Sequence, residues 1–172
     1  MQELISKNTI RKFVKKLGKQ ITKEYSSIEK PLILIGILKG SVIFMADLIR
    51  EIKLPVNIDF MMISSYGPDN IQEKEIKIIL DLNTPIADRD VIILEDILDS
   101  GRTFSKILTL LKSRNPRSLK TCALLNKKEC RVVDVHLDFG GIEIPDKYVY
   151  GYGLDDNQLQ RNLPYIEVKD DK

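Results

Sequence analysis

The hydrophobic and polar positions of this chain alternate between strand-like and helix-like segments. Pro31–Leu38, Val91–Leu94 and Leu119–Leu125 are apolar runs of strand length, and the middle one is typical of a strand buried on both faces. Two other segments, about Asn8–Tyr25 and Ser41–Lys53, have apolar residues at helical spacing. Because strands and helices alternate, the pattern predicts an α/β fold with a mostly parallel central sheet flanked by helices on both faces.

Shorter segments complete this prediction. Val56–Ile63 and Ile76–Leu82 are expected strands that flank a polar run, Ser64–Glu73. Further short strands are expected near Arg131–Val135 and Lys147–Gly151. The first helix is expected to begin at Asn8, because asparagine is a favoured helix N-cap.

Composition limits the class of protein. The 172 residues are 43% hydrophobic and 30% charged, which is typical of one globular domain spanning residues 1–172. The net charge of +2 argues against a nucleic-acid-binding surface over the whole protein, though not against a local basic patch. No apolar run reaches membrane-spanning length and residues 1–30 are charged throughout, so we expect no signal peptide or membrane anchor and a cytoplasmic protein.

Two cysteines and one histidine exclude several kinds of chemistry. Cys122 and Cys130 are too few for a disulfide scaffold and lack zinc-ligand spacing, which favours reduced thiols. His136 alone cannot supply both a catalytic relay and a zinc site, and a structural role is its simpler interpretation. Acid–base chemistry therefore falls to carboxylates, and any metal should be a hard cation such as magnesium.

The most informative segment is Val91–Lys112. Its apolar strand is followed by the adjacent acids Glu95 and Asp96, and apolar residues at helical spacing then lead to a helix that ends near Ser113. A loop that opens onto a helix N-terminus binds phosphate, because free backbone N–H groups and the helix dipole favour an anion there. The preceding acids suit the vicinal hydroxyls of a sugar or a hard cation, so the segment indicates a site for a phosphorylated sugar. A third acid, Asp99, precedes the expected anion loop, which consists of Ser100, Gly101, Arg102 and Thr103.

Each of these residues also has an ordinary structural interpretation. Acid pairs often end strands in solvent, Ser-Gly often forms only a turn, and Asp99 is a favoured residue type for capping the next helix. Glu95 and Asp96 should point to opposite sides of a strand, so one would face the core if the strand continued. Both acids are less costly at the open carboxyl end of a sheet, where ligands bind, and this favours the functional interpretation.

Val91–Thr103 resembles the phosphoribosyl-diphosphate-binding motif of the type I phosphoribosyltransferases. From about Thr9 to Ile166 the chain is similar to the bacterial hypoxanthine (hypoxanthine-guanine) phosphoribosyltransferases of that family. Four strings carry this likeness: L-K-G-S at 38–41, S-S-Y-G at 64–67, L-L-N-K at 124–127 and I-P-D-K-Y-V-Y-G-Y-G-L-D at 144–155. The resemblance implies the type I fold with a small hood formed by terminal segments. It also implies purine salvage, in which a purine ring nitrogen displaces pyrophosphate from phosphoribosyl diphosphate to give a nucleotide.

The resemblance assigns roles to the residues of the motif. Asp99 would be the catalytic base that accepts the purine proton. Glu95 and Asp96 would bind the ribose hydroxyls and also Mg2+, directly or through water. The 5-phosphate would be held by Ser100, Gly101 and Thr103, with Arg102 as an auxiliary residue because its position varies in the family.

Outside the motif, the resemblance places the leaving group and a lid. Lys39, Gly40 and Arg161 would bind pyrophosphate, and family members often have a cis peptide at the lysine, which the sequence alone does not decide for Leu38–Lys39. Ser65 and Tyr66 would belong to a lid that closes over the reacting centre and excludes water. The alternative for this segment is an exposed hairpin loop.

The purine would bind near the carboxyl end of the chain. Lys127 would donate to the 6-oxo group of the base, although a solvent-exposed lysine is the alternative. Tyr148 would stack on the purine, or else be an ordinary core aromatic, and Val149 would offer backbone groups to the base edge. Asp155 would complete the purine site and bind a second magnesium through water.

Three departures from the family pattern, Asp156, Tyr150 and Leu80, leave the fold prediction intact but leave open the preference among hypoxanthine, guanine and xanthine. We expect small-molecule partners, phosphoribosyl diphosphate and a 6-oxopurine, and no nucleic-acid or membrane partner. Because family members are commonly dimers or tetramers, we expect a homodimer or homotetramer.

Three other classes of protein fit less well. The only Gly-Lys pair, Gly18-Lys19, lies in an expected helix and is followed by Gln20, so a P-loop nucleotidase is excluded. A receiver-type signalling domain needs an acid pair near the N-terminus, where only Glu3 precedes Glu24. A nucleic-acid-binding regulator of the same fold would lose catalytic residues and show a basic stripe.

Overall fold

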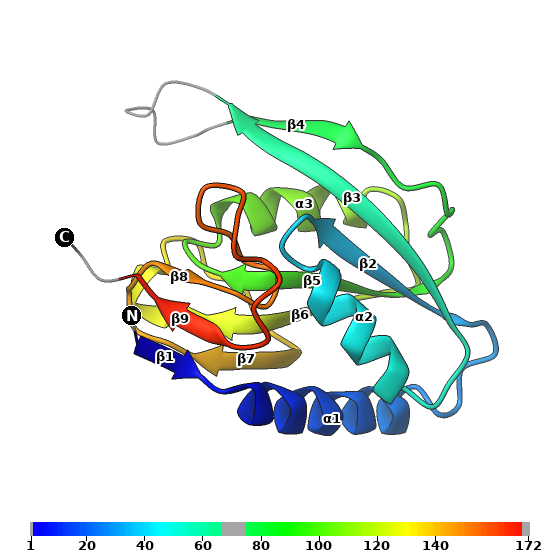
Figure 1. Ribbon diagram of the computed structural model, residues 1–172. Helices are drawn as coiled ribbons and strands as arrows, with labels where there is room; N and C mark the ends of the chain where they lie inside the picture. Colours follow the sequence, from blue (N-terminus) through cyan, green and yellow to red (C-terminus); the bar gives the residue numbers. More distant parts are fainter. Residues whose placement is uncertain (1, 67–74, 170–172) are drawn as a thin grey trace.

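A computed structural model describes residues 2–66 and 75–169 of the chain (Figure 1). In this part of the chain, the main sheet has six strands in the order β4-β3-β2-β5-β6-β7. All neighbours pair in parallel except β3 and β4, which are antiparallel. The mostly parallel sheet expected from the sequence is therefore confirmed. Its strands are β2 (Leu32–Leu38), β3 (Val56–Tyr66), β4 (Glu75–Leu80), β5 (Asp90–Leu98), β6 (Ser118–Asn126) and β7 (Phe139–Glu143).

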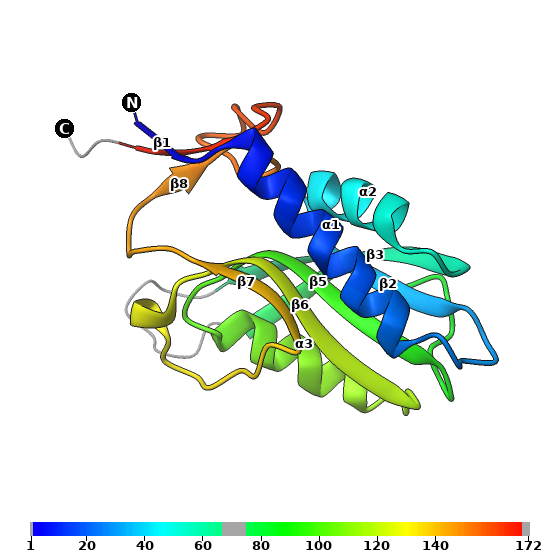
Figure 2. The same ribbon diagram turned by 90° about the horizontal axis from the view of Figure 1, so that it is seen from below.

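Helices cover both faces of this sheet, as predicted (Figure 2). On one face lie α1 (Lys7–Glu24) and α2 (Val42–Glu51), and on the other lies α3 (Arg102–Lys112). The buried apolar residues form two clusters, one containing the inner faces of α1 and α2 and the other that of α3. Each helix is amphipathic, so burial of its apolar face against the sheet stabilises the three layers. A short 3-10 helix, η1 (Lys128–Cys130), follows β6.

The position of β5 in the middle of the sheet explains its apolar sequence. It pairs in parallel with β2 on one side and β6 on the other, and Val91 to Leu94 are fully buried. The carboxyl ends of β2, β5 and β6 therefore meet at one edge of the sheet. Ligands bind at this edge in open α/β sheets, so the fold brings the loops after these three strands together where the sequence predicts the site.

A second, three-stranded sheet has the order β1-β9-β8, with both pairs antiparallel. It consists of β1 (Gln2–Ile5), β8 (Val149–Tyr150) and β9 (Ile166–Val168). Both ends of the chain thus join the segment after β7, and the small sheet lies beside the carboxyl ends of β6 and β7 (Figures 1 and 2). This is the small hood of terminal segments that the resemblance implied.

Two local predictions were wrong. The first helix begins at Lys7, and its N-cap is Ser6, whose Oγ accepts a hydrogen bond of 3.1 Å from the Thr9 N–H, so Asn8 lies inside the helix. The expected strand at Arg131–Val135 does not form. Residues 131–135 instead form an irregular segment, and the N–H groups of Val132 and Val133 donate to the Ser100 carbonyl in the loop before α3.

Two strands are longer than expected. Ser64, Ser65 and Tyr66 belong to β3, opposite Lys77, Ile76 and Glu75 of β4, rather than to a polar loop. The central strand does not stop at Leu94 but continues through the acid pair to Leu98. Within the described residues, no helix is both long and apolar enough to cross a membrane.

Candidate active site

Two adjoining cavities lie at the carboxyl edge of the main sheet. The first, here called the α3 cavity, has a volume of about 230 Å³ and lies between the end of β5 and α3. The second, the β8 cavity, has a volume of about 260 Å³ and is bounded by β5, Lys127 and the segment around β8. Ile97 and Asp99 line both cavities, so this end of β5 forms the wall between them.

The acid pair separates these cavities. Glu95 lines the α3 cavity and Asp96 the β8 cavity, as the alternation of side chains along a strand requires. Glu95 Oε2 is buried without a hydrogen-bond partner. Burial, the Asp96 charge and a hydrogen bond to Asp96 raise the pKa of Glu95 well above its ordinary value. Burial likewise raises the pKa of Asp96 to about 6, although the Ile97 N–H, at 2.8 Å, opposes this shift.

Two half-buried carboxyl groups with raised pKa values and an unpaired oxygen are costly to folding unless a ligand uses them. In the sequence, a strand that continued through the acid pair would argue against a functional role for the two acids. In the structure, this continuation supports such a role. The acids face two cavities and not a sealed core.

The loop Asp99, Ser100 and Gly101 leads directly into α3, so Arg102 and Thr103 of the expected anion loop lie in the first turn of the helix. Gly101 has a φ of 81°, and a Cβ at this position would lie 2.4 Å from the Val133 carbonyl oxygen, so only glycine fits. Helix α3 begins at Arg102, whose N–H donates to Ser100 Oγ at 3.4 Å, and Thr103 and Phe104 of its first turn line the α3 cavity. The sequence predicts an anion site at this helix N-terminus. Ser100, Gly101 and Thr103 line it.

Asp99 is exposed and lies between the two cavities. It is not the N-cap of α3, because Gly101 occupies that position. The alternative interpretation of Asp99 as a capping residue is therefore wrong, and its carboxylate is available for chemistry.

The turn after β2 contacts the acid pair. The Leu38–Lys39 peptide is cis, which decides the question that the sequence left open. A Cβ at Gly40 would lie 1.4 Å from Asp96 Oδ2, so the main chain of this turn packs directly on the carboxylate. Gly153, with a φ of 104°, also packs on this turn, since a Cβ on Gly153 would lie 2.1 Å from the Gly40 carbonyl oxygen.

A polar network joins this turn to the loop after β8. Arg161 forms an ion pair of 2.8 Å with Asp155 and donates to the Gly153 carbonyl at 2.8 Å. Gln158 Oε1 accepts from Lys39 Nζ at 3.3 Å and from Arg161 at 3.4 Å. Two cationic side chains from segments far apart in the sequence therefore lie on either side of Gln158. Their proximity is consistent with a shared anionic ligand, and the Arg161 charge also lowers the pKa of Asp96.

Lys127, at the end of β6, has a side chain that is only 10% exposed. Its Nζ lies 3.5 Å from Asp146 Oδ1, and the residue lines the β8 cavity. The alternative of a solvent-exposed lysine is therefore wrong. Its neighbour Lys128 has that character, with a side chain that is 65% exposed and paired to Glu143.

Tyr148 and Val149 line the same cavity as Lys127. Tyr148 is 50% exposed, so it is not an ordinary core aromatic. Its hydroxyl donates to the Asp155 carbonyl at 3.0 Å, and Lys169 Nζ lies 5.3 Å from the centre of its ring. Val149 is buried in β8, where it pairs with Val168. The aromatic ring is thus held in the wall of the β8 cavity by the hydrogen bond from its hydroxyl and the cation–π contact with Lys169.

Ser65 and Tyr66 end β3, and residues 67–74 of the expected lid lie outside the described residues. Within the described ranges 2–66 and 75–169, no three His, Cys, Asp or Glu side chains are close enough together to hold a metal ion alone. The expected ligands Glu95 and Asp96 lie together, but Asp155 is engaged by Arg161.

Several residues at the site were not predicted. Asp146 pairs with Lys127, Gln158 links the two cationic side chains, and Arg131 binds the loop at the end of β5. A hydrogen bond to Asp146, burial and the nearby Asp99 raise the pKa of the Cys130 thiol to about 11, so this cysteine is an unreactive neighbour of the site. The only signal for Arg131 in the sequence is a charge at the start of an apolar segment.

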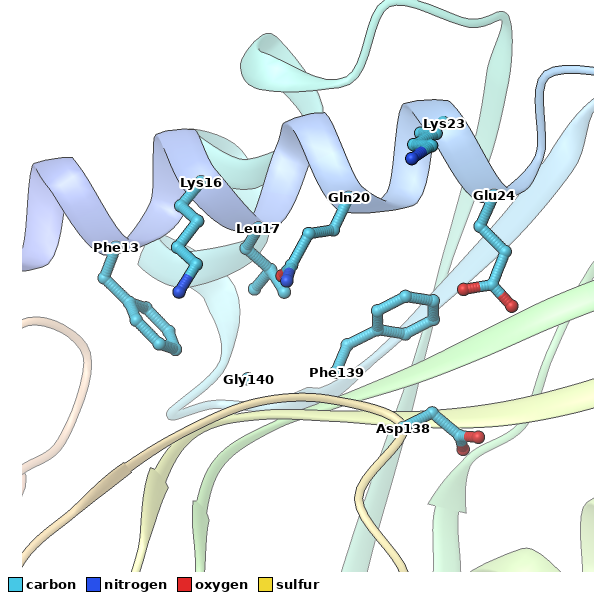
Figure 3. Close-up of a pocket in the computed structure, with 9 residues that line it drawn as sticks. All are labelled: Phe13, Lys16, Leu17, Gln20, Lys23, Glu24, Asp138, Phe139 and Gly140. Atoms are coloured by element: carbon cyan, nitrogen blue, oxygen red, sulfur yellow. The ribbon is translucent and has the colours of Figure 1, made fainter.

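A larger cavity, of about 620 Å³, lies away from this edge, between α1 and the outer strand β7 (Figure 3). Phe13, Lys16 and Gln20 point from α1 toward β7, where Phe139 faces them. The lining of this larger cavity contains neither the acids at the end of β5 nor a helix N-terminus. We therefore assign the chemistry to the two smaller cavities.

Comparison with known proteins identifies the family of the chain. The model of the phosphoribosyl transferase domain matches residues 6–157. The hypoxanthine phosphoribosyltransferase of Buchnera aphidicola subsp. Schizaphis graminum is 49% identical over 163 residues, which cover 95% of this chain and 92% of the relative. The hypoxanthine-guanine phosphoribosyltransferase of Bacillus subtilis is 48% identical over 165 residues, covering 96% of this chain and 91% of the relative.

Solved structures show the same fold. A crystal structure of a hypoxanthine-guanine phosphoribosyltransferase from Bacillus anthracis superposes with a TM-score of 0.93 at 38% identity, covering 98% of each chain. A hypoxanthine phosphoribosyltransferase from Staphylococcus aureus gives a TM-score of 0.91 at 45% identity, covering 97% of this chain and 90% of the other.

Proposed function

The chain belongs to the phosphoribosyl transferase domain family, and we propose that it transfers the 5-phosphoribosyl group of phosphoribosyl diphosphate to hypoxanthine or guanine, with release of pyrophosphate. One observation carries this proposal. Asp99 lies between a cavity with an anion-binding helix N-terminus and a cavity that contains a buried lysine and an exposed tyrosine. A sugar phosphate in the first and a purine in the second would meet beside this carboxylate.

In this reaction, the bond between the anomeric carbon and the pyrophosphate oxygen breaks, and a bond from that carbon to a purine ring nitrogen forms. Positive charge develops on the sugar while pyrophosphate leaves with the electron pair. Lys39 and Arg161 supply cationic groups for the departing anion, and the α3 N-terminus holds the 5-phosphate. Asp99 accepts the proton that the purine loses.

Lys127 distinguishes purines by the group at position 6. Its ammonium is buried at the end of β6 and donates to a 6-oxo group, whereas the amino group of adenine would present a second donor. Tyr148 provides an aromatic face beside this lysine for stacking on the base. Asp155 orients the Arg161 side chain by ion pairing, and the main chain of Val149 lies at the base edge.

Glu95 and Asp96 bind the two ribose hydroxyls and contribute to a magnesium site. The unpaired Glu95 Oε2 and the raised pKa values of both acids fit such ligands, because hydroxyl donors or a divalent cation stabilise the ionised carboxyls. Magnesium is usually held by one or two carboxylates together with phosphate oxygens and water, which suits this pair, and Asp155 would contribute to a second magnesium through water. When bound, the cation neutralises charge on the pyrophosphate.

The remaining expectations complete the proposal. Ser65 and Tyr66, at the end of β3, are the first residues of a lid that excludes water from the reacting centre. We also propose that the protein is a cytoplasmic homodimer or homotetramer.

The test is an initial-rate assay with hypoxanthine, guanine, xanthine and adenine at saturating phosphoribosyl diphosphate and magnesium. We expect hypoxanthine, and guanine with it, to give nucleotide and pyrophosphate in equal amounts, and adenine to give neither. A nucleic-acid gel shift run beside it addresses the regulator alternative. Absence of nucleotide from every 6-oxopurine would refute the proposal.

A further inference from the structure

Arg131 makes an unusually complete set of hydrogen bonds at the end of β5. Its Nε donates to the Asp99 carbonyl at 2.8 Å, and its two terminal nitrogens donate to the carbonyls of Leu98 and Val135, each at 3.3 Å. One terminal nitrogen also donates to Asn126 Oδ1 at 2.5 Å. The guanidinium therefore joins the end of β5, the end of β6 and the segment before β7.

The residues after Arg131 bind the same loop. The N–H groups of Val132 and Val133 both donate to the Ser100 carbonyl, at 2.9 and 3.0 Å. A Cβ at Gly101 would lie 3.0 Å from the Arg131 side chain, so the loop packs closely against the arginine. The Lys127 N–H donates to the Leu98 carbonyl at 3.0 Å, which attaches the lysine to the same peptide groups.

Asp99 has few other restraints. It follows the last residue of β5, its side chain is exposed, and α3 begins three residues later without a side-chain cap. Apart from a hydrogen bond between its carboxylate and the Cys130 thiol, the direction of the Asp99 side chain is set by the orientation of its own backbone. Arg131 holds this backbone through the adjacent carbonyls of Leu98 and Asp99.

We propose that Arg131 is a positioning residue that fixes the direction of the Asp99 carboxylate relative to the Lys127 ammonium. This inference rests on the proposed function, in which Asp99 takes the purine proton. Arginine is suited to the task, because its planar guanidinium donates in several fixed directions, whereas a lysine ammonium is a point charge on a flexible chain. Lysine at this position would leave some of the four acceptors unpaired and the Asp99 peptide free to rotate.

The variant Arg131→Lys tests the proposal. The Val132 and Val133 N–H bonds to Ser100 remain, so the phosphate loop should keep its shape. We expect kcat with hypoxanthine to fall about 10- to 100-fold while both KM values change less than about threefold, because a displacement of about 1 Å in a reacting group costs up to about 10²-fold in rate. A second variant, Arg131→Ala, should lose more and should recover turnover when guanidinium is added at millimolar concentration.

Arg117→Lys is the matched control. Arg117 donates two hydrogen bonds to Asp90 at the opposite end of β5, so this change also removes an arginine fork from the same strand. We expect it to lower the thermal midpoint without changing kcat at 25 °C. Near-normal kcat in Arg131→Lys, or equal losses of kcat in both variants, would overturn the positioning role. If added guanidinium does not raise the turnover of Arg131→Ala, the positioning role is also overturned. Absence of turnover in the unsubstituted protein would refute the proposed function itself.

Discussion

Asp96→Asn should make the protein more stable and less active at the same time. The carboxyl of Asp96 is half-buried beside Glu95, and its pKa is raised from 3.8 to about 6. Asparagine has nearly the same shape and keeps an oxygen to accept the Ile97 N–H at 2.8 Å. The substitution therefore removes mainly the charge.

The sign and size of the effect follow from linkage between proton binding and folding. An acid whose pKa is higher in the folded state stabilises that state only while neutral, so its contribution is fully present below about pH 3.8 and is lost as the pH rises through about 6. A difference of about two pKa units corresponds to about 3 kcal/mol at 1.36 kcal/mol per unit. At pH 8, Asp96→Asn should therefore gain on the order of 2–3 kcal/mol in free energy of unfolding, and at pH 4 almost none.

Urea denaturation between pH 4 and pH 8 measures this difference directly. Asp90→Asn is the control, since Asp90 lies at the other end of β5 and Arg117 lowers the pKa of its carboxyl. A lowered pKa stabilises the folded state above the unfolded pKa and ceases to do so as the pH falls. Asp90→Asn should thus lose stability at pH 8 and lose less at pH 4, the opposite dependence.

Activity should change in the other direction. Asp96→Asn should raise the KM for phosphoribosyl diphosphate and the magnesium requirement, because the neutral amide cannot replace a carboxylate beside the cation. In the unsubstituted protein, affinity for this substrate should rise with pH between about 5 and 7, as Asp96 ionises. A variant that is less stable than the unsubstituted protein at pH 8, or a stability difference that does not depend on pH, would refute the reasoning.

Two further predictions concern the walls of the site. Lys127→Ala should reduce kcat/KM for hypoxanthine about 10- to 150-fold, the value of a charge-assisted hydrogen bond of about 1.5–3 kcal/mol, and leave adenine unchanged. Equal losses on both bases in initial-rate assays would mean that Lys127 does not read the base. Gly40→Ala would place a Cβ 1.4 Å from Asp96 Oδ2. It should raise the KM for phosphoribosyl diphosphate about 5- to 150-fold, the equivalent of 1–3 kcal/mol of overpacking. Gly36→Ala, with contacts of 3.0 Å, is the milder control in the same assay.

The layers of the fold were predictable because they depend on local patterns. The apolar residues of β2, β5 and β6 and the helical spacing in α1 and α3 are each visible within a short window of sequence. Strand ends were less predictable. The central strand extends past Leu94 because Ile97 and Leu98 complete its pairing with β6, and two acids within a strand give no signal of this continuation.

The hood shows where local patterns are insufficient. Its strands are two to four residues long, too short for a period of two to be recognised. β1 pairs with β9 from the opposite end of the chain, a contact that no local pattern indicates. Only the resemblance to a known family indicated that terminal segments form this part.

At the site, the residues of one contiguous motif were recognised together, because strand, acids, loop and helix follow one another in sequence. Contacts between distant segments could not be predicted in the same way. The packing of Gly40 on Asp96 and the bonds from Arg131 to Asp99 depend on how three strand ends meet. Asp99 is not a helix cap, because α3 begins at Arg102 with Gly101 as its N-cap. Lys127 is not a solvent-exposed lysine, because its side chain is buried.

The central claim is that Asp99, between the two cavities, takes the purine proton. The most direct measurement is the kcat of Asp99→Asn with hypoxanthine, together with its dissociation constant for phosphoribosyl diphosphate measured by calorimetry. The account predicts a kcat about 10²- to 10⁴-fold lower, the usual value of a positioned proton acceptor, and an almost unchanged dissociation constant. A kcat near that of the unsubstituted protein would contradict it.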